Sequence, residues 1–187
     1  MNEVLKAIRE RRSVRKLKPD PIPDAERDLI VESALYAPSA KNAQAWHVTV
    51  VQNIGAIDRI TDEVKAGIIR CDVERYIPLA NSPEYKVNFG GSMVVILSID
   101  PAVTPCPAED TGCALQNMFL AAHSLGIASC WLNQVGPVAD DAKVRALLTE
   151  LGVPTRNKIY GCAAFGYAAG DLPSAPPRKD GTVNHVR

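Results

Sequence analysis

The sequence lacks the charge bias and the long apolar runs that would assign it to several large classes of protein. Its 21 basic residues equal its 21 acidic residues, so the formal net charge is zero. Nucleic acid and anionic membrane surfaces both select basic proteins, so a neutral chain is a poor match for either. Its apolar runs are also shorter than a bilayer span requires. We therefore expect no nucleic-acid partner and no membrane partner.

Cysteine and histidine are present but form no pattern typical of a bound metal or a redox pair. The cysteines are odd in number, no C-x-x-C motif occurs, and the histidines show no zinc-type spacing with them. Most of the cysteines lie in apolar stretches, as buried free thiols do. The N-terminus resembles a polar amphipathic helix rather than a signal peptide. These features predict a reduced, cytoplasmic protein without a metal.

Glycine-rich nucleotide motifs are missing as well. The sequence contains no G-x-G-x-x-G, which argues against a dedicated dinucleotide-binding fold. Gly161 and Gly166 have the spacing of a phosphate-binding loop, but the lysine and the serine or threonine that should follow are absent.

The length of the chain indicates one domain over residues 1–187. With about half of its residues apolar, a chain of this length can bury a core without disulfides. Helical periodicity predicts helices at 3–10, 24–37, around 57–68, 110–125 and 140–151. Apolar runs predict strands at 47–51, 92–99, 127–132 and 158–165. Because residues 92–99 are apolar throughout, this strand should be central and covered on both faces.

Two segments suggest contact with a second subunit. The predicted helix 110–125 is apolar almost all round, which indicates burial against a partner as well as against the sheet of its own chain. Residues 171–187 are rich in proline, and proline extends a chain rather than compacting it. This tail is long enough to cross onto another subunit.

The first candidate site is a cluster of cations near the N-terminus. Arg11, Arg12, Ser13 and Arg15 place three guanidinium groups and a hydroxyl within five positions. A guanidinium binds phosphate through two parallel hydrogen bonds and keeps its charge at every physiological pH. The alternative is a solvated basic surface just past a helix end. Taken alone, the cluster favours that alternative.

The second candidate site is the polar loop from Pro38 to Trp46. Pro38 and Ser39 end the preceding helix and expose the backbone. Asn42 and Gln44 offer donors and acceptors suited to the edge of a heterocyclic ring. The alternative is an ordinary loop leading into a strand, with Trp46 in the core.

The order and spacing of the two segments together resemble the nitroreductase family. The resemblance continues through the run Cys113–Met118, through Leu125–Trp131, and through Gly166-Tyr167 to Arg178. It implies a nitroreductase-like α+β fold in which helices flank a central mixed, mostly antiparallel sheet. It also implies an intertwined homodimer with FMN at the subunit interface and the C-terminal tail reaching the partner.

Carried over residue by residue, the resemblance assigns a set of cofactor contacts. Arg11, Arg12, Ser13 and Arg15 would contact the flavin phosphate, ribityl chain and pyrimidine edge. Arg178 and Lys179 would complete the grip on the phosphate. Pro38, Ser39 and Ala40 of the other subunit would line the benzenoid end, with Asn42 in the same loop. Backbone N–H groups around Leu132 and Asn133 would face N5 and O4 of the flavin.

The chain departs from the family pattern at two places. Ala45 stands where the family usually has proline, which should loosen that loop. Asn133 and Gln134 stand where glycines are common, and their side chains would narrow the substrate side or offer it a hydrogen bond. Both departures bear on substrate range rather than on the flavin.

The implied activity is the reduction of nitroaromatics, quinones or a similar small acceptor with NADH or NADPH by a ping-pong mechanism. The flavin carries the chemistry, so no catalytic side chain is expected. Two alternatives stay open. One keeps the flavin but changes the reaction to reductive dehalogenation or flavin fragmentation, for which Tyr76–Asn88 is the candidate lid. The other is a non-enzymatic protein that binds flavin or another phosphorylated ligand.

Overall fold

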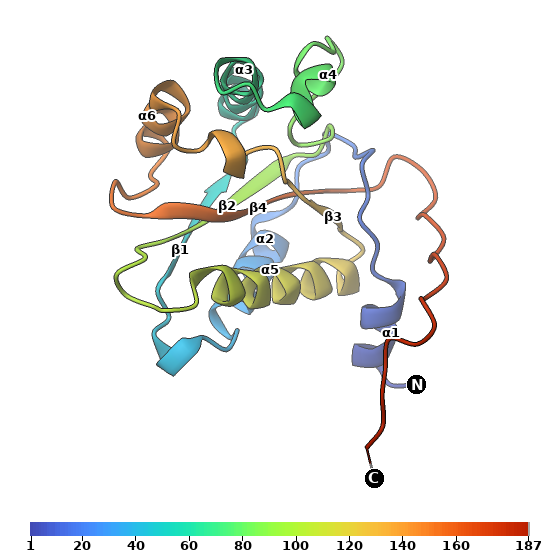
Figure 1. The fold of residues 1–187 in the computed structure, drawn as a ribbon. Coiled ribbons are helices and arrows are strands. Elements are labelled where there is room, and N and C mark those ends of the chain that lie inside the picture. The colour runs from blue at the N-terminus through green and yellow to red at the C-terminus, as the bar shows by residue number, and fades with distance from the viewer. Residues whose placement is uncertain (187) are drawn as a thin grey trace.

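Four antiparallel strands form one sheet with helices on both faces in the computed structural model, which describes residues 1–186 (Figure 1). The order across the sheet is β1 (Trp46–Val51), β2 (Met93–Ile99), β4 (Lys158–Gly166) and β3 (Ala128–Trp131). All three pairings between these strands are antiparallel. The α+β class and the mostly antiparallel sheet predicted from the sequence are confirmed.

Strand β2 divides the core into two layers. Every residue of β2 is buried, as its uniform apolar sequence predicts. Val94 and Ile96 pack toward α3 (Ile54–Arg70) and α6 (Ala142–Glu150), whereas the alternate residues pack toward α2 (Asp24–Leu35) and α5 (Pro107–Ser124). Figure 1 shows α3, α6 and the short α4 (Ile77–Ala80) on one face of the sheet and α2 and α5 on the other.

Several helix ends differ from the sequence-based expectation, among them both ends of α6, which starts at Ala142 rather than at 140, and two ends that lie beside a proline. Helix α2 ends at Leu35 rather than Ala37, and the Ala37 N–H donates to the Ala34 carbonyl in a tight turn. Pro38 restricts the residue before it, so the chain leaves the helix early. Helix α5 begins at Pro107 rather than at Asp110 or Thr111, because proline is well suited to the first helical turn. Asp110 therefore lies inside the first turn.

The N-terminal helix α1 (Glu3–Glu10) is capped by Asn2, whose side chain accepts from the Leu5 N–H at 2.9 Å. Its apolar face is exposed: Val4, Leu5 and Ile8 keep half or more of their surface in contact with solvent. Residues 169–186 are also exposed throughout. Figure 1 shows this tail leaving the body of the protein. The predicted tail extends to residue 187, which lies outside the described residues.

Residues 13–17 cross the ends of several core elements. The Val14 N–H donates to the Ser129 carbonyl at 3.0 Å, so Ser13 forms a short parallel bridge with β3. The Leu17 N–H donates to the Phe89 carbonyl at 3.0 Å.

Three short 3₁₀ turns complete the fold, at Ala40–Asn42, Glu74–Tyr76 and Gly136–Val138. None of the helices described between residues 1 and 186 combines the length and apolarity needed to cross a bilayer.

Candidate functional site

The cation cluster follows directly after α1 and carries no neutralising carboxylate. The Arg11 guanidinium lies 5.8 Å from the centre of the Phe119 ring on α5. Partial burial, and then the neighbouring charge of Arg12, lower the pKa of Arg11. Among residues 1–186, no ion pair joins Arg11, Arg12 or Arg15 to an acidic side chain. The cluster is therefore a local excess of positive charge suited to an anion.

Arg12 has a buried hydrogen-bond donor that a ligand could satisfy. One terminal nitrogen donates to the Arg9 and Arg11 carbonyls, each at 2.7 Å, which fixes the side chain. Its Nε is buried without a hydrogen-bond partner. A buried unpaired donor is costly, and a phosphate oxygen would satisfy it. The residues present thus fit a bound phosphate group.

Ser13 lies beside a buried thiol. Cys130 on β3 is only 2% exposed, and burial raises its pKa even though Arg15, a hydrogen bond with Ser13, and Arg11 oppose that shift. A thiol that stays protonated and shielded is structural rather than nucleophilic. The structure therefore favours a packing role for Cys130, with Ser13 tying the cation cluster to the end of the sheet.

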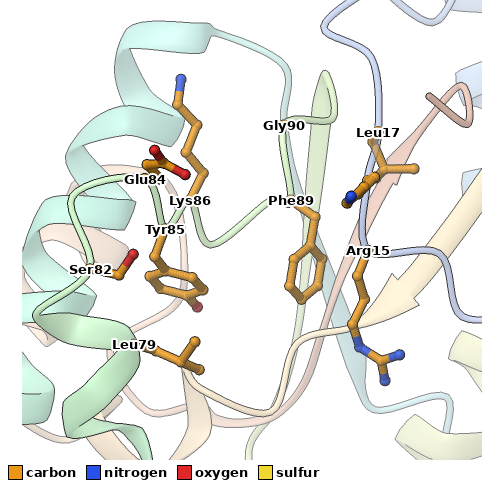
Figure 2. Close-up of a pocket in the computed structure, with 10 residues that line it drawn as sticks. Arg15, Leu17, Leu79, Ser82, Glu84, Tyr85, Lys86, Phe89 and Gly90 are labelled. Carbon is orange, nitrogen blue, oxygen red and sulfur yellow. The ribbon is translucent and has the colours of Figure 1, made fainter.

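Two pockets flank residues 13–17, and Arg15 borders both. The smaller, of about 290 Å³, lies between Ser13, Arg15 and the start of the tail. The larger, of about 490 Å³, lies between Arg15 and the segment from Leu79 to Gly90 (Figure 2). Arg15 is exposed and so can reach a ligand in either pocket.

The loop with Pro38, Ser39, Ala40 and Asn42 lies at the opposite end of α5. The Ala40 N–H donates to Asp110 in the first turn of α5, whereas Arg11 contacts Phe119 further along the same helix. These two positions differ by about 14 Å along the helix axis. Within one chain, the structure does not bring this loop to the cation cluster.

The conformation of this loop is unusual for residues other than glycine. Lys41, Asn42 and Gln44 all have positive φ angles, of 53°, 54° and 47°. The Ser39 hydroxyl accepts from the Gln44 N–H at 3.0 Å, and the Asn42 carbonyl oxygen Oδ1 accepts from the Gln44 side chain at 3.0 Å. The loop holds its own shape through these bonds, despite the alanine at position 45.

Leu132 and Asn133 follow the end of β3 and differ in whether the backbone N–H is available to a ligand. Leu132 is buried, and its N–H already donates to the Cys162 carbonyl at 2.8 Å. Of the two expected backbone donors, only the Asn133 N–H is therefore available. Asn133 is exposed and, together with Trp131 and Tyr160, lines a pocket of about 230 Å³. The next residue, Gln134, is buried with its Oε1 atom unpaired.

Arg178 and Lys179 lie in the exposed tail, away from the cation cluster in the sequence and without any hydrogen bond to the domain among the described residues. The structure of one chain does not complete the predicted phosphate grip with them. Both side chains are exposed, so a second molecule can reach them.

Sequence reasoning did not single out several residues that shape the site, and it included Tyr85 only as part of the candidate lid Tyr76–Asn88. Tyr85 and Phe89 line the larger pocket, Phe119 supports Arg11, and Asp110 anchors the Ala40 loop. Aromatic residues make up only 5% of the sequence, so two of them within five positions were an available signal. Nothing in the sequence marks Asp110 as a loop anchor. Among the described residues, no cluster of three or more His, Cys, Asp or Glu side chains could hold a metal ion.

The known proteins that resemble this chain include several nitroreductases. The chain shares 40% identity with a nitroreductase with bound FMN from Bacteroides fragilis, with full coverage of both chains and a TM-score of 0.95. It shares 29% identity with a second FMN-bound nitroreductase, from Desulfitobacterium hafniense, with full coverage of both chains and a TM-score of 0.86. A putative NADH dehydrogenase/NAD(P)H nitroreductase from Archaeoglobus fulgidus is 29% identical, over 89% of this chain and 86% of that protein.

The family assignment covers nearly the whole domain. The Nitroreductase family profile matches residues 8–167, from the last turn of α1 to the residue after β4. This range includes the cation cluster, the Pro38 loop and the end of β3. The chain belongs to the nitroreductase family.

Proposed function

We propose that the protein is an FMN-dependent oxidoreductase that uses NADH or NADPH to reduce nitroaromatics, quinones or similar small acceptors. The proposal is carried by Arg11 and Arg12, which form no ion pair with an acidic side chain among residues 1–186. In addition, Nε of Arg12 is buried without a hydrogen-bond partner. Support also comes from the similar proteins, which include FMN-bound nitroreductases and an FMN reductase [NAD(P)H] from Bacillus subtilis that is 28% identical over 99% of this chain.

In this proposal the cation cluster holds the polar end of the cofactor. Arg11, Arg12 and Ser13 bind the phosphate and ribityl chain, and the tail residues Arg178 and Lys179 add two more cations. Arg15 faces the pyrimidine edge, where its permanent charge favours electron-rich states of the ring. The Asn133 N–H is the backbone donor toward N5 and O4, because the Leu132 N–H is already used within the sheet.

When bound, FMN supplies the hydride chemistry, so the protein needs no catalytic side chain of its own. The contribution of the chain is to bind the cofactor, to orient its ring, and to admit donor and acceptor in turn. A ping-pong mechanism, in which the donor leaves before the acceptor binds, is consistent with these roles of the cofactor and the protein. All five cysteines are free thiols, so we also place the protein in a reducing compartment such as the cytoplasm.

We further propose a homodimer in which the partner chain completes the site. The Pro38–Asn42 loop lies too far along α5 to serve the cation cluster of its own chain, but a partner chain can supply it. The exposed apolar face of α1 and the exposed tail are two surfaces that a dimer would cover. This arrangement gives each flavin contacts from both subunits.

An absorbance spectrum tests the proposal most directly. The purified protein is recorded before and after anaerobic addition of NADH or NADPH, with added FMN if it is colourless. We expect flavin bands at ~450 nm that bleach with at least one donor. A protein that fails to take up FMN would overturn the cofactor assignment. A protein that binds FMN but bleaches with neither donor would instead indicate a non-enzymatic flavin-binding protein.

A further inference from the structure

The loop between α2 and β1 uses most of its polar groups to hold its own shape. The Ala40 N–H donates to Asp110, and the Asn42 N–H donates to the Ser39 carbonyl at 2.9 Å. The Ser39 hydroxyl accepts from the Gln44 N–H, and the Asn42 Oδ1 accepts from the Gln44 side chain. The two amides that the sequence suggested for the edge of a ring are therefore bonded to each other.

Lys41, in the middle of this loop, takes no part in these side-chain bonds. Its side chain is exposed, and neither a hydrogen bond nor an ion pair joins its ammonium group to another of the residues 1–186. A lysine ammonium offers three donors and a positive charge. Lys41 therefore presents an unpaired cation to any ligand that reaches the loop.

The backbone at Lys41 is held in a conformation that lysine rarely adopts. Its φ of 53° and ψ of 23° lie in the left-handed region. Hydrogen bonds on both sides enforce this conformation, because the Ala40 N–H is tied to Asp110 and the Ala43 N–H donates to the Ala40 carbonyl at 3.0 Å. Backbone strain that the surroundings enforce is characteristic of functional sites. Here it fixes the direction in which the Lys41 side chain leaves the loop.

The position of the loop decides which ligand Lys41 can meet. Figure 1 shows the turn at Ala40–Asn42 beyond the start of α5, on the side of the molecule away from α1. In the proposed homodimer this loop lies at the benzenoid end of the flavin that the partner chain binds. The cation cluster of that chain lies at the polar end of the same flavin. Lys41 thus adds one positive charge at the end of the ring that the cation cluster does not serve.

A single ammonium group suits a ligand with a single negative charge. The pyrophosphate of NADH or NADPH carries two charges and would be matched better by several cations together. A carboxylate or sulfonate on a small ring carries one charge, and it accepts a charge-assisted hydrogen bond from lysine. The charge at Lys41 therefore fits an electron acceptor better than the electron donor.

We propose that Lys41 of the partner chain makes the enzyme prefer electron acceptors that carry a carboxylate or sulfonate group. The inference rests on the proposed function, including its dimer, and it names the class of acceptor that this site selects. For a quinone Q with such a group the overall reaction is NAD(P)H + H⁺ + Q → NAD(P)⁺ + QH₂. The anionic group is unchanged by the reaction, and Lys41 is not consumed.

The first test measures binding to the FMN-loaded protein without a reductant. The ligands are 2-naphthoate and 2-naphthamide, which have nearly the same shape and differ in charge. Calorimetric titration of the wild-type protein should show tighter binding of the naphthoate. In Lys41→Met this preference should fall about three- to tenfold, because a partly exposed charge-assisted hydrogen bond is lost. Lys41→Arg keeps the charge and should keep the preference.

A lysine elsewhere provides the matched control. Lys143 is also exposed and has no ion pair among the described residues, but it lies on α6, on the other side of the sheet. Lys143→Met removes the same charge from the chain and should keep the naphthoate preference. Lys41→Gly should lose the preference and retain the melting temperature of the wild type, because glycine adopts a positive φ readily. Misfolding is therefore a separable outcome.

The second test separates the two half-reactions by stopped flow. Lys41→Met should slow reoxidation of the reduced enzyme by 1,4-naphthoquinone-2-sulfonate about three- to tenfold. Reoxidation by the uncharged 1,4-naphthoquinone, and reduction by NADH or NADPH, should be unchanged. Added salt should weaken the advantage of the sulfonated quinone in the wild-type protein, because salt screens exposed charges. The rate with Lys41→Met should depend less on salt.

Two results would overturn the inference. One is a naphthoate preference that is equal in the wild-type protein and in Lys41→Met. The other is a Lys41→Met enzyme that is slow with NADPH but normal with the sulfonated quinone, which would assign the cation to the donor. Failure of the proposed function is distinguishable from both. In that case the wild-type flavin would not bleach with either donor, whereas the naphthoate preference of the FMN-loaded protein would still report on Lys41.

Discussion

The backbone N–H of Ala40 donates a hydrogen bond of 2.8 Å to Oδ1 of Asp110, a residue distant in the sequence. Asp110 is 3% exposed, and its second oxygen accepts from the Thr104 hydroxyl at 2.8 Å. Its place in the first turn of α5 also lets the helix dipole stabilise the carboxylate. One buried side chain therefore fixes the loop that we propose to serve the partner subunit.

Asp110→Ala should loosen the Ala40 loop and lower both stability and cofactor binding. Removal of the carboxylate leaves the Ala40 N–H and the Thr104 hydroxyl without their acceptor, at a cost of about 1–3 kcal/mol for each group left unpaired. Urea unfolding and FMN titration measure the two effects. Asp110→Asn retains one oxygen acceptor and should lose less. Unchanged FMN affinity in Asp110→Ala would contradict a role for the loop in the site.

Arg11→Ala should weaken FMN binding by about ten- to a hundredfold, because a charge-assisted hydrogen bond to phosphate is worth about 1.5–3 kcal/mol. Arg178→Ala should act in the same direction. Arg59 is a matched control, since it is an arginine paired with Glu150 on the exposed surface between α3 and α6. Fluorescence titration of FMN distinguishes the variants. Equal affinity in Arg11→Ala and Arg59→Ala would rule out the phosphate assignment.

Ile8→Lys should disrupt the proposed dimer, because it places a charge on the exposed apolar face of α1. Ile69→Lys is the matched control, since Ile69 is similarly exposed but lies on α3, on the other side of the sheet. Light scattering reports the oligomeric state of both variants. A wild-type protein that is monomeric while fully loaded with FMN would refute the dimer and the placement of Pro38 and Ser39 across an interface.

Gly91→Ala should destabilise the fold strongly. A Cβ atom at Gly91 would lie 2.5 Å from the Phe165 carbonyl oxygen and 2.8 Å from a Leu17 methyl group, so the backbone must move. Overpacking of this kind typically costs about 1–3 kcal/mol. At Gly136 a Cβ would meet nothing within 4 Å, so Gly136→Ala should be close to neutral. Thermal unfolding of the two variants gives the comparison.

Asp141 should make the protein sensitive to acid. Its pKa is held below the ordinary aspartate range, chiefly by hydrogen bonding to Arg70, and its Oδ1 also caps α6 through the Val144 N–H at 3.2 Å. A depressed native pKa contributes stability above the unfolded pKa of about 4, and this contribution is lost as the pH falls below that value. Asp141→Asn keeps the cap and loses the titration. Its melting temperature should fall less between pH 5 and pH 3 than that of the wild type.

Local sequence patterns predicted the fold well because they report local physics. The buried strand β2 and the long helices around it follow from apolar runs and helical periodicity, although ends of α2, α5 and α6 were misplaced and the short α4 was not predicted. The site was less accessible to this reasoning. The cation cluster is visible as a run of arginines, but the Asp110 anchor and the Tyr85–Phe89 pocket depend on contacts between distant segments. The free N–H at Asn133 rather than Leu132 depends on strand register, which composition does not encode.

The bridge between Ser13 and β3 also has a consequence for how the protein is made. The ribosome releases the N-terminus first, yet the pairing partner of Ser13 emerges only after most of the chain has been synthesised. Contacts between residues so far apart form late because their loop-closure cost is high. Until then the arginines remain tethered but undocked, and the outer edge of β3 has no neighbour. Assembly of the anion site and closure of this sheet edge would thus be a single event near the end of folding.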